Sequence, residues 1–147
     1  MTAATPAYEL IVDHQIVLSV FRTWPSFHDG EVLRLLLDRT RRSDAGAFVP
    51  SIELWVRGWN MTQDVTAQGF YRLENDSVVH FLFEGVTDVE LDGLNHQNVL
   101  SGLDLETLSA EDGGASTLVV ELNHCYGLSG GFKAMRARVV AIEPYRV

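Results

Sequence analysis

The chain has 147 residues, of which 46% are hydrophobic and 21% are charged, a composition typical of one globular domain with its own core. The single cysteine, Cys125, excludes an internal disulfide framework and indicates a reducing compartment. No apolar run reaches the roughly 18 residues that a membrane-spanning helix needs. The first basic residue is Arg22, so a secretory signal is not expected either. We therefore predict one cytoplasmic domain over residues 1–147, with no membrane contact.

The charge of the chain is strongly negative and unevenly spread. Twenty acidic residues against 11 Lys and Arg give a formal net charge of −9. Between Arg72 and Lys133 there are 11 acidic residues and no Lys or Arg. Such a stretch disfavours nucleic-acid binding, because phosphates would be repelled, and it suits a basic protein partner. Alternatively, the acids only solvate exposed strand faces.

The first regular element predicted along the chain is a helix over residues 13–23, with Asp13 as its N-cap. Pro25 is expected to end it, and residues 24–30 are typical of a turn with aromatic anchors. Trp24 and Phe27, on either side of Pro25, should pack the helix against the rest of the fold. The apolar residues at helical spacing are Ile16, Val17, Val20, Phe21 and Trp24.

After Gly30 the hydrophobic period shortens from about 3.6 to 2, which indicates strands. Leu33, Leu35 and Leu37 are expected on one strand face. Turns are predicted at 74–76 and 127–131. We predict an α+β, mostly β fold, in which the helix packs on a mainly antiparallel sheet or sandwich of seven or eight strands connected as a meander. The predicted strands cover residues 33–38, 52–59, 69–73, 77–84, 88–92, 102–108, 116–125 and 132–142.

The adjacent pair His28 and Asp29 has the residue types of a metal site or a proton relay. Metal-dependent phosphohydrolases carry such a pair on a helix, however, and this chain is mostly strands. We favour a structural role, in which the two residues hydrogen-bond the backbone at the entrance to the first strand.

Other candidate metal and phosphate sites lack the required spacing. The five histidines and Cys125 show no zinc pattern, and His124 beside Cys125 on a strand would point to the opposite face. Residues 88–93 are similar to a calcium loop, but the twelfth position is Val99 instead of a glutamate. Glycines 127–131 are not followed by a phosphate-binding GK[ST]. We predict no catalytic residue, metal or other cofactor.

Two groups of residues are candidates for partner binding. Asp88, Glu90 and Asp92 should share the solvent face of one strand. Trp55, Arg57 and Trp59 should lie opposite the apolar face of another strand, and Trp and Arg are enriched at interface hot spots. Because large aromatic rings are usually buried, we favour the alternative that the helix or a second sheet covers these tryptophans.

The string Trp24-Pro25-Ser26-Phe27-His28-Asp29-Gly30-Glu31-Val32-Leu33 resembles the WPSFHDaEV signature of the immunity protein 50 family of bacterial polymorphic toxin systems. Residues 81–86, 94–100, 126–127 and the Gly-Gly-Phe turn are also similar to that family. The resemblance extends over most of residues 20–145, and Gly30 replaces the usual alanine. It implies a small, mostly β protein that binds and neutralises a cognate toxin, with no enzymatic activity.

We therefore expect a non-enzymatic immunity protein that binds a basic toxin, mainly through the acidic stretch 73–132. One alternative is a small β-sheet ligand-binding or accessory module, and another is a hydrolase that uses His28, Asp29 and further histidines. A homodimer is left open.

Overall fold

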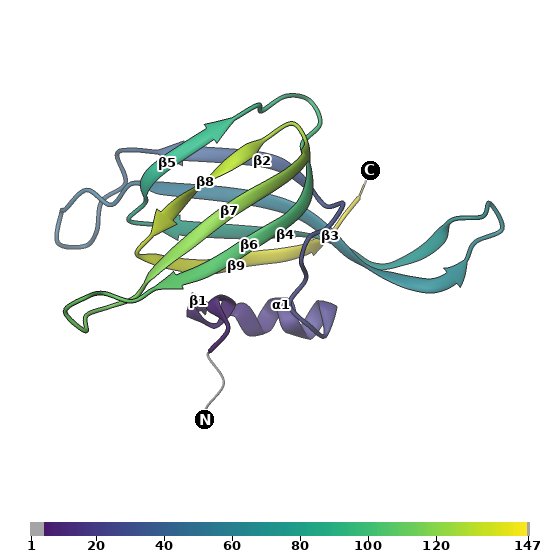
Figure 1. Ribbon diagram of the computed structural model, residues 1–147, viewed down its shortest axis with the longest axis horizontal. Coiled ribbons are helices and arrows are strands. Elements are labelled where there is room, and N and C mark those ends of the chain that lie inside the picture. Colours follow the sequence, from purple (N-terminus) through teal and green to yellow (C-terminus); the bar gives the residue numbers. More distant parts are fainter. Residues whose placement is uncertain (1–4, 147) are drawn as a thin grey trace.

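The computed structural model describes residues 5–146, and strands make up most of them (Figure 1). Within these residues, one α-helix and a mixed sheet of nine strands confirm the predicted α+β, mostly β class, with more strands than expected. The elements in chain order are η1 (Ala7–Leu10), β1 (Ile11–Val12), α1 (His14–Phe21), β2 (Glu31–Asp38), β3 (Ser51–Val65), β4 (Tyr71–Glu84), β5 (Thr87–Asp92), β6 (Val99–Leu108), β7 (Thr117–Tyr126), β8 (Ser129–Ala134) and β9 (Arg136–Pro144).

The sheet folds over into two layers. Strands β1-β9-β4-β3-β2 form the first layer and β6-β7-β8-β5 form the second. Among the strand pairs of the described residues, only that of Glu31 in β2 with Val99 in β6 joins the two layers. A bulge follows at once in β2, between Val32 and Arg34. The expected meander is right for β2-β3-β4 and β6-β7-β8. It is wrong for β9, which crosses to pair with β4, and for β5, which crosses to the far edge.

The core lies between the two layers, because each strand turns alternate apolar side chains inward. Strand β3 shows this alternation most clearly: Ile52, Leu54 and Val56 are fully buried, whereas the residues between them are half-exposed. Strands of the second layer contribute the opposite wall of the same cluster. Its buried members there are Leu100, Leu103, Leu118, Val120, Leu122, Phe132 and Ala134.

Helix α1 lies below the opening between the layers and packs on β9 and β4 (Figure 1). Phe27, only 3% exposed, makes edge-on contacts with Phe21 of α1 and Phe81 of β4. A Cβ on Gly58 would come within 2.8 Å of the Phe27 ring, so the glycine makes room for it. Trp24 is half-buried and also contacts Phe81. These contacts confirm that the aromatic residues beside Pro25 pack the helix on the sheet.

The predicted start of the helix is right, but its predicted end is wrong. Asp13 does precede α1, but it has a left-handed φ of 65° and its side chain makes no capping hydrogen bond. The helix ends at Phe21, because Arg22 turns left-handed and donates its N–H to the Leu18 carbonyl. That hydrogen bond terminates the helix before Pro25 is reached.

Four predictions about strands and turns also need correction. Residues 74–76 form no turn, since β4 runs through them with only a bulge at Asn75 (φ 58°). The true β3–β4 turn is closed at Thr66 and Phe70, at the tip of an arm that projects from the body (Figure 1).

Glycines 130 and 131 belong to strand β8, and Met135 divides the predicted strand 132–142. Leu33 is the extra residue of the β2 bulge, so it leaves the face of Leu35 and Leu37.

Candidate functional site

The predicted acidic trio lies on β5, at the edge of the second layer. Glu90 and Asp92 point away from the core, because Leu91 between them packs against it. Asp88 is part of a bulge between Thr87 and Glu90 and has a left-handed φ of 53°. Its carboxylate forms an ion pair with Lys133 Nζ at 3.1 Å. The strand prediction for residues 88–92 is therefore confirmed.

Strand register places further acids beside the trio. Glu121 of β7 is directly opposite Asp104 of β6, and on its other side it is opposite Gly131 of β8, which in turn pairs with Glu90. Three carboxylates thus lie in one row across four strands, interrupted only by a glycine. Asn123 donates a hydrogen bond from its side-chain amide to Asp104. We call the outward-facing acids of this layer the acidic face: Asp88, Glu90, Asp92, Asp104, Glu106 and Glu121.

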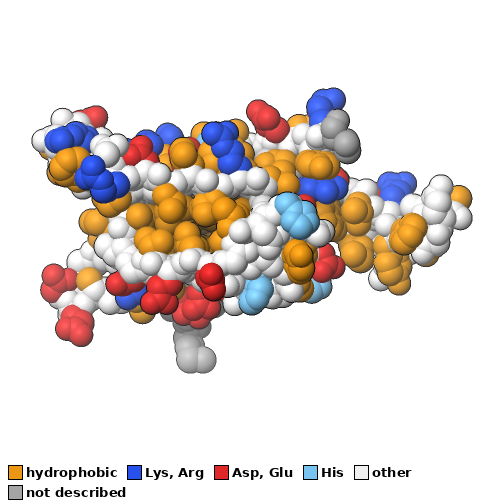
Figure 2. All heavy atoms as spheres, turned by 90° about the horizontal axis from the view of Figure 1, so that it is seen from above, with side chains coloured by type: hydrophobic (Ala, Val, Ile, Leu, Met, Phe, Trp, Pro, Cys, Tyr) orange, Lys and Arg blue, Asp and Glu red, His pale blue; other side chains and the backbone are white. Residues whose placement is uncertain are grey.

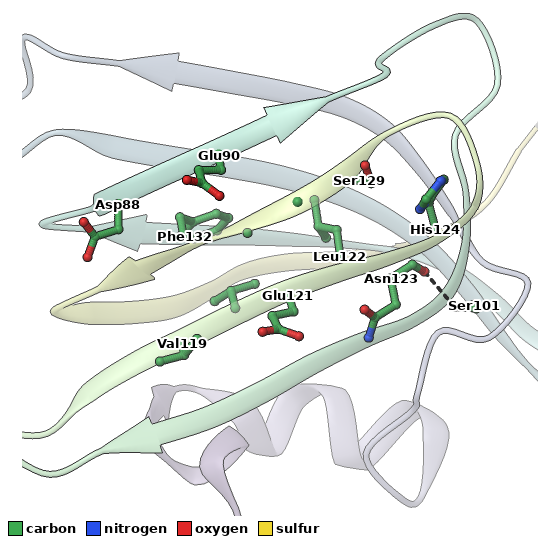
Figure 3. A pocket seen from close by; sticks show the side chains of 13 residues that line it. Asp88, Glu90, Ser101, Val119, Glu121, Leu122, Asn123, His124, Ser129 and Phe132 are labelled. Carbon is green, nitrogen blue, oxygen red and sulfur yellow. Dashed lines mark hydrogen bonds between the residues drawn. The ribbon is translucent and has the colours of Figure 1, made fainter.

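A hollow of about 730 Å³ opens in the acidic face where β8 carries two glycines (Figure 3). A Cβ on Gly131 would lie 2.5 Å from the Val120 carbonyl oxygen, so β8 can approach β7 this closely only with glycine there. Glu90 and Glu121 flank the hollow from the two neighbouring strands (Figure 3). Ser101, Asn123, His124 and Ser129 add polar groups at its end. The site is therefore a polar, carboxylate-lined depression in the sheet surface.

We expected the partner to bind mainly through the acidic stretch 73–132, but the acids of this stretch do not lie on one surface. Three of its acids belong to the first layer, where arginines neutralise them: Glu74 pairs with Arg72, Asp76 with Arg57, and Glu84 with Arg41. On the acidic face, Asp88 is the only acid with an ion pair among the described residues. The strand acids of this stretch that have no ion pair among the described residues are thus all in the second layer.

The outer face of the first layer carries the predicted tryptophans in a different setting. Trp55 is stacked on His80, with ring centres 4.0 Å apart and planes 16° apart, and the Arg34 guanidinium lies 4.4 Å from the same indole. His80 Nε2 donates to Glu53 Oε1 at 2.8 Å. These four side chains come from β2, β3 and β4 and partner one another.

Arg57 is the centre of a second group on that face. It donates two hydrogen bonds to Asp76, at 2.9 and 2.7 Å, and these bonds raise the pKa of the guanidinium above its usual value. Its guanidinium also lies 3.7 Å from the Tyr145 ring centre and 5.2 Å from that of Trp59. We call the two groups together the Arg–Trp face: Arg34, Glu53, Trp55, Arg57, Trp59, Asp76, His80 and Tyr145.

The expectation that a helix or second sheet covers these tryptophans is wrong. The second layer packs on the inner side of β3, and Trp55 and Trp59 lie on the outer side, where they are only partly buried. Their burial comes from stacking with neighbours on the same face.

His28 and Asp29 lie at the junction of the two layers. His28 Nδ1 donates to the Ser101 carbonyl at 2.9 Å, and the Asp29 N–H donates to the Leu100 carbonyl at 2.8 Å. Asp29 has a left-handed φ of 63°, which Asp tolerates better than most residues. Its carboxylate lies 3.6 Å from His28 Nε2, and both side chains are more than half exposed. These contacts support the structural role: His28 contributes its side chain and Asp29 its backbone amide.

Within residues 5–146, no three His, Cys, Asp or Glu side chains are placed to share a metal ion. No helix in the described part of the chain is long and apolar enough to cross a membrane.

Comparisons with protein-family models, curated proteins and solved structures found no match for this chain. The resemblance of residues 24–33 to the immunity protein 50 signature therefore stays a prediction. One detail departs from that signature: a Cβ on Gly30 would lie 2.5 Å from the Arg57 carbonyl oxygen. The usual alanine would require the backbone to shift here.

Proposed function

We propose that the chain is a cytoplasmic, non-enzymatic immunity protein that binds and neutralises a basic protein toxin through its acidic face. The observation that carries the proposal is the row of uncompensated carboxylates on neighbouring strands, Asp104, Glu121 and Glu90. Like charges opposite one another destabilise a sheet. Nothing in the packing of the sheet requires this repulsion between carboxylates, whereas a bound cationic partner would remove it.

The hollow at Gly131 supports the same partner chemistry. It is open, polar and flanked by two carboxylates, so it offers room and charge complementarity for a lysine or arginine side chain. Interfaces of this kind gain association rate from the charges at their rim. The resemblance to immunity proteins supplies the class of partner, and the acidic face supplies its charge.

The Arg–Trp face is the weaker candidate. Its charged groups already satisfy each other, as the two hydrogen bonds from Arg57 to Asp76 and the one from His80 to Glu53 show. A partner would have to compete with these internal contacts.

The test is co-expression with the protein encoded by the neighbouring gene, which is the partner expected of an immunity protein. We expect the chain to restore growth and to form a stable complex with that protein. The variant Glu90→Gln/Asp92→Asn/Glu121→Gln should protect poorly. A matched control is Glu9→Gln/Asp44→Asn/Asp64→Asn, which changes the net charge equally but alters exposed acids outside the acidic face. Equal protection by the two variants would contradict the proposal.

A further inference from the structure

Two strand edges are left unpaired on the same side of the molecule. Beyond its bridge at Glu31, β2 pairs only with β3, and β5 pairs only with β8. In the described residues no other element forms backbone hydrogen bonds with residues 33–38 or 87–92. Figure 1 shows β2 and β5 at the top of the molecule, each on the outer margin of its layer. Open edges of this kind present backbone N–H and C=O groups to an incoming strand.

The space between these two edges exposes the interior of the fold. Seen from above, apolar side chains fill the depression between the two layers (Figure 2). Strand register places Leu37 of β2 on the inner face, opposite buried Ile52, yet it is 57% exposed. Val89 precedes Glu90 on the inward side of β5 and is 43% exposed. Their neighbours Leu35 and Leu91 are only partly buried against the core. We call this depression the open seam.

We propose that the open seam receives a β-strand of the partner, which adds to the free edge of β5 and lies between β5 and β2. This inference rests on the proposed function and specifies how the toxin is held. Residues of the incoming strand would alternate: apolar side chains would pack on Leu37 and Val89, and basic side chains would point outward beside Glu90. Main-chain hydrogen bonds would supply affinity, and the alternating side chains would supply specificity.

The charge on β5 decides between a basic partner and a second copy of this chain. If two copies paired through β5, their Asp88, Glu90 and Asp92 would lie side by side and repel. Shortness, a bulge and charged residues are the features by which natural edge strands avoid pairing with themselves, and β5 has all three. A strand with outward lysine or arginine residues meets no such repulsion.

Amide hydrogen exchange of the complex with the neighbouring gene's protein tests the proposal directly. Strand addition should slow exchange within residues 33–38 and 87–92, because backbone N–H groups on these edges would become hydrogen-bonded. Docking through side chains of the acidic face alone would leave the edge amides as they are. A complex without edge protection would therefore overturn the seam proposal and leave the proposed function intact.

Charged substitutions in the open seam give a second readout. Val89→Glu and Leu37→Glu should each raise the Kd for the toxin about tenfold or more, because a carboxylate would be buried without a partner. Val65→Glu is the matched control, since Val65 is 63% exposed on the projecting β3–β4 arm. It should change the Kd by less than about twofold. Thermal unfolding of all three variants will show whether they are folded, and equal effects at all three positions would contradict the proposal.

A partner-free probe separates failure of the seam from failure of the proposed function. The probe is an end-blocked synthetic peptide of alternating valine and lysine. Edge protection by this peptide without any complex with the neighbouring protein would support the seam and reject that protein as the toxin. If neither ligand protects the edge amides from exchange, the seam proposal is overturned. A dimer of the free chain with protected β5 amides would also overturn it, because the occupant would be a second copy.

Discussion

The two outer faces of this molecule treat charge in opposite ways. On the Arg–Trp face, Arg57 is hydrogen-bonded to Asp76 and His80 to Glu53, and the aromatic rings stack on these groups. On the acidic face, Glu121 is opposite another acid, Asp104, and no cation balances either of them among the described residues.

This contrast separates two uses of polar side chains. Charges that are paired and half-buried stabilise the layer that carries them. Like charges on adjacent strands cost stability and are expected where a binding partner compensates them. Tryptophan and arginine suggested a second interface in the sequence, and in the structure they also stabilise the layer that carries them. The interface that we propose lies on the layer without arginine pairs.

The largest expected effect concerns the core that both faces share. Phe27→Ala removes a buried ring that contacts Phe21 and Phe81. The unfolding free energy should fall by about 3–5 kcal/mol, measured by chemical denaturation. Trp24→Ala is the comparison: it should cost less, because Trp24 is only half-buried. A Phe27→Ala variant as stable as wild type would show that the helix does not depend on this contact.

The next effect measures the internal pairing of the Arg–Trp face. Arg57→Ala leaves Asp76 without its two hydrogen bonds and Tyr145 without its cation. The variant should be less stable by about 1–3 kcal/mol. Arg72→Ala breaks a more exposed ion pair, with Glu74, and should cost at most about 1 kcal/mol. Equal losses would mean that the Arg57 group is an ordinary surface ion pair.

A third prediction concerns the hollow of the acidic face. Gly131→Ala would place a Cβ 2.5 Å from the Val120 carbonyl oxygen, so β7 and β8 must separate. Overpacking of this kind should cost about 1–3 kcal/mol and should also weaken partner binding. Gly102→Ala is the matched control, because its nearest contact would be Asp104 Oδ1 at an ordinary 3.5 Å. Similar melting of the two variants would contradict the close approach of β8.

The smallest expected effect is that of neutralising one acid of the acidic face. It should differ in sign from the effect of the same kind of substitution on the Arg–Trp face. Glu121→Gln removes repulsion from Asp104 and should leave the unfolding free energy unchanged or raise it by up to about 0.5 kcal/mol. Asp76→Asn should lower it by about 1–3 kcal/mol, since a charged hydrogen bond to Arg57 is weakened. Denaturation of both variants at one pH checks the comparison. Losses in both would show that the acids of the second layer are structurally required.

Much of the fold could be predicted from the sequence, because strand alternation is a local signal. Residues 52–59 show it without ambiguity, and β3 covers them. Turns were less reliable: Glu74-Asn75-Asp76 has turn residues, but pairing with β3 keeps β4 extended through them. Likewise, Gly130 and Gly131 are typical turn residues, and here they are strand residues that allow close packing.

The candidate site was only partly predictable for a related reason. Glu90 and Asp92 are two residues apart, so their common face follows from period 2, whereas the bulge at Asp88 could not be predicted in this way. Glu121 and Asp104 join them only through the register of β6, β7 and β8, which is a long-range property. The open seam depends on β5 crossing to the far edge, and that crossover left no local trace in the sequence.

The central claim is that the acidic face guides a basic toxin to this protein. Its most direct test is the rate of association with the neighbouring gene's protein, measured by stopped flow at low and high salt. Glu90→Gln/Asp92→Asn/Glu121→Gln should slow association about three- to tenfold at low salt and little at high salt, since salt screens such charges. The control Glu9→Gln/Asp44→Asn/Asp64→Asn, with the same net charge, should associate like wild type. Identical low-salt rates for the two variants would contradict the claim and direct attention to Trp55, Arg57 and Trp59.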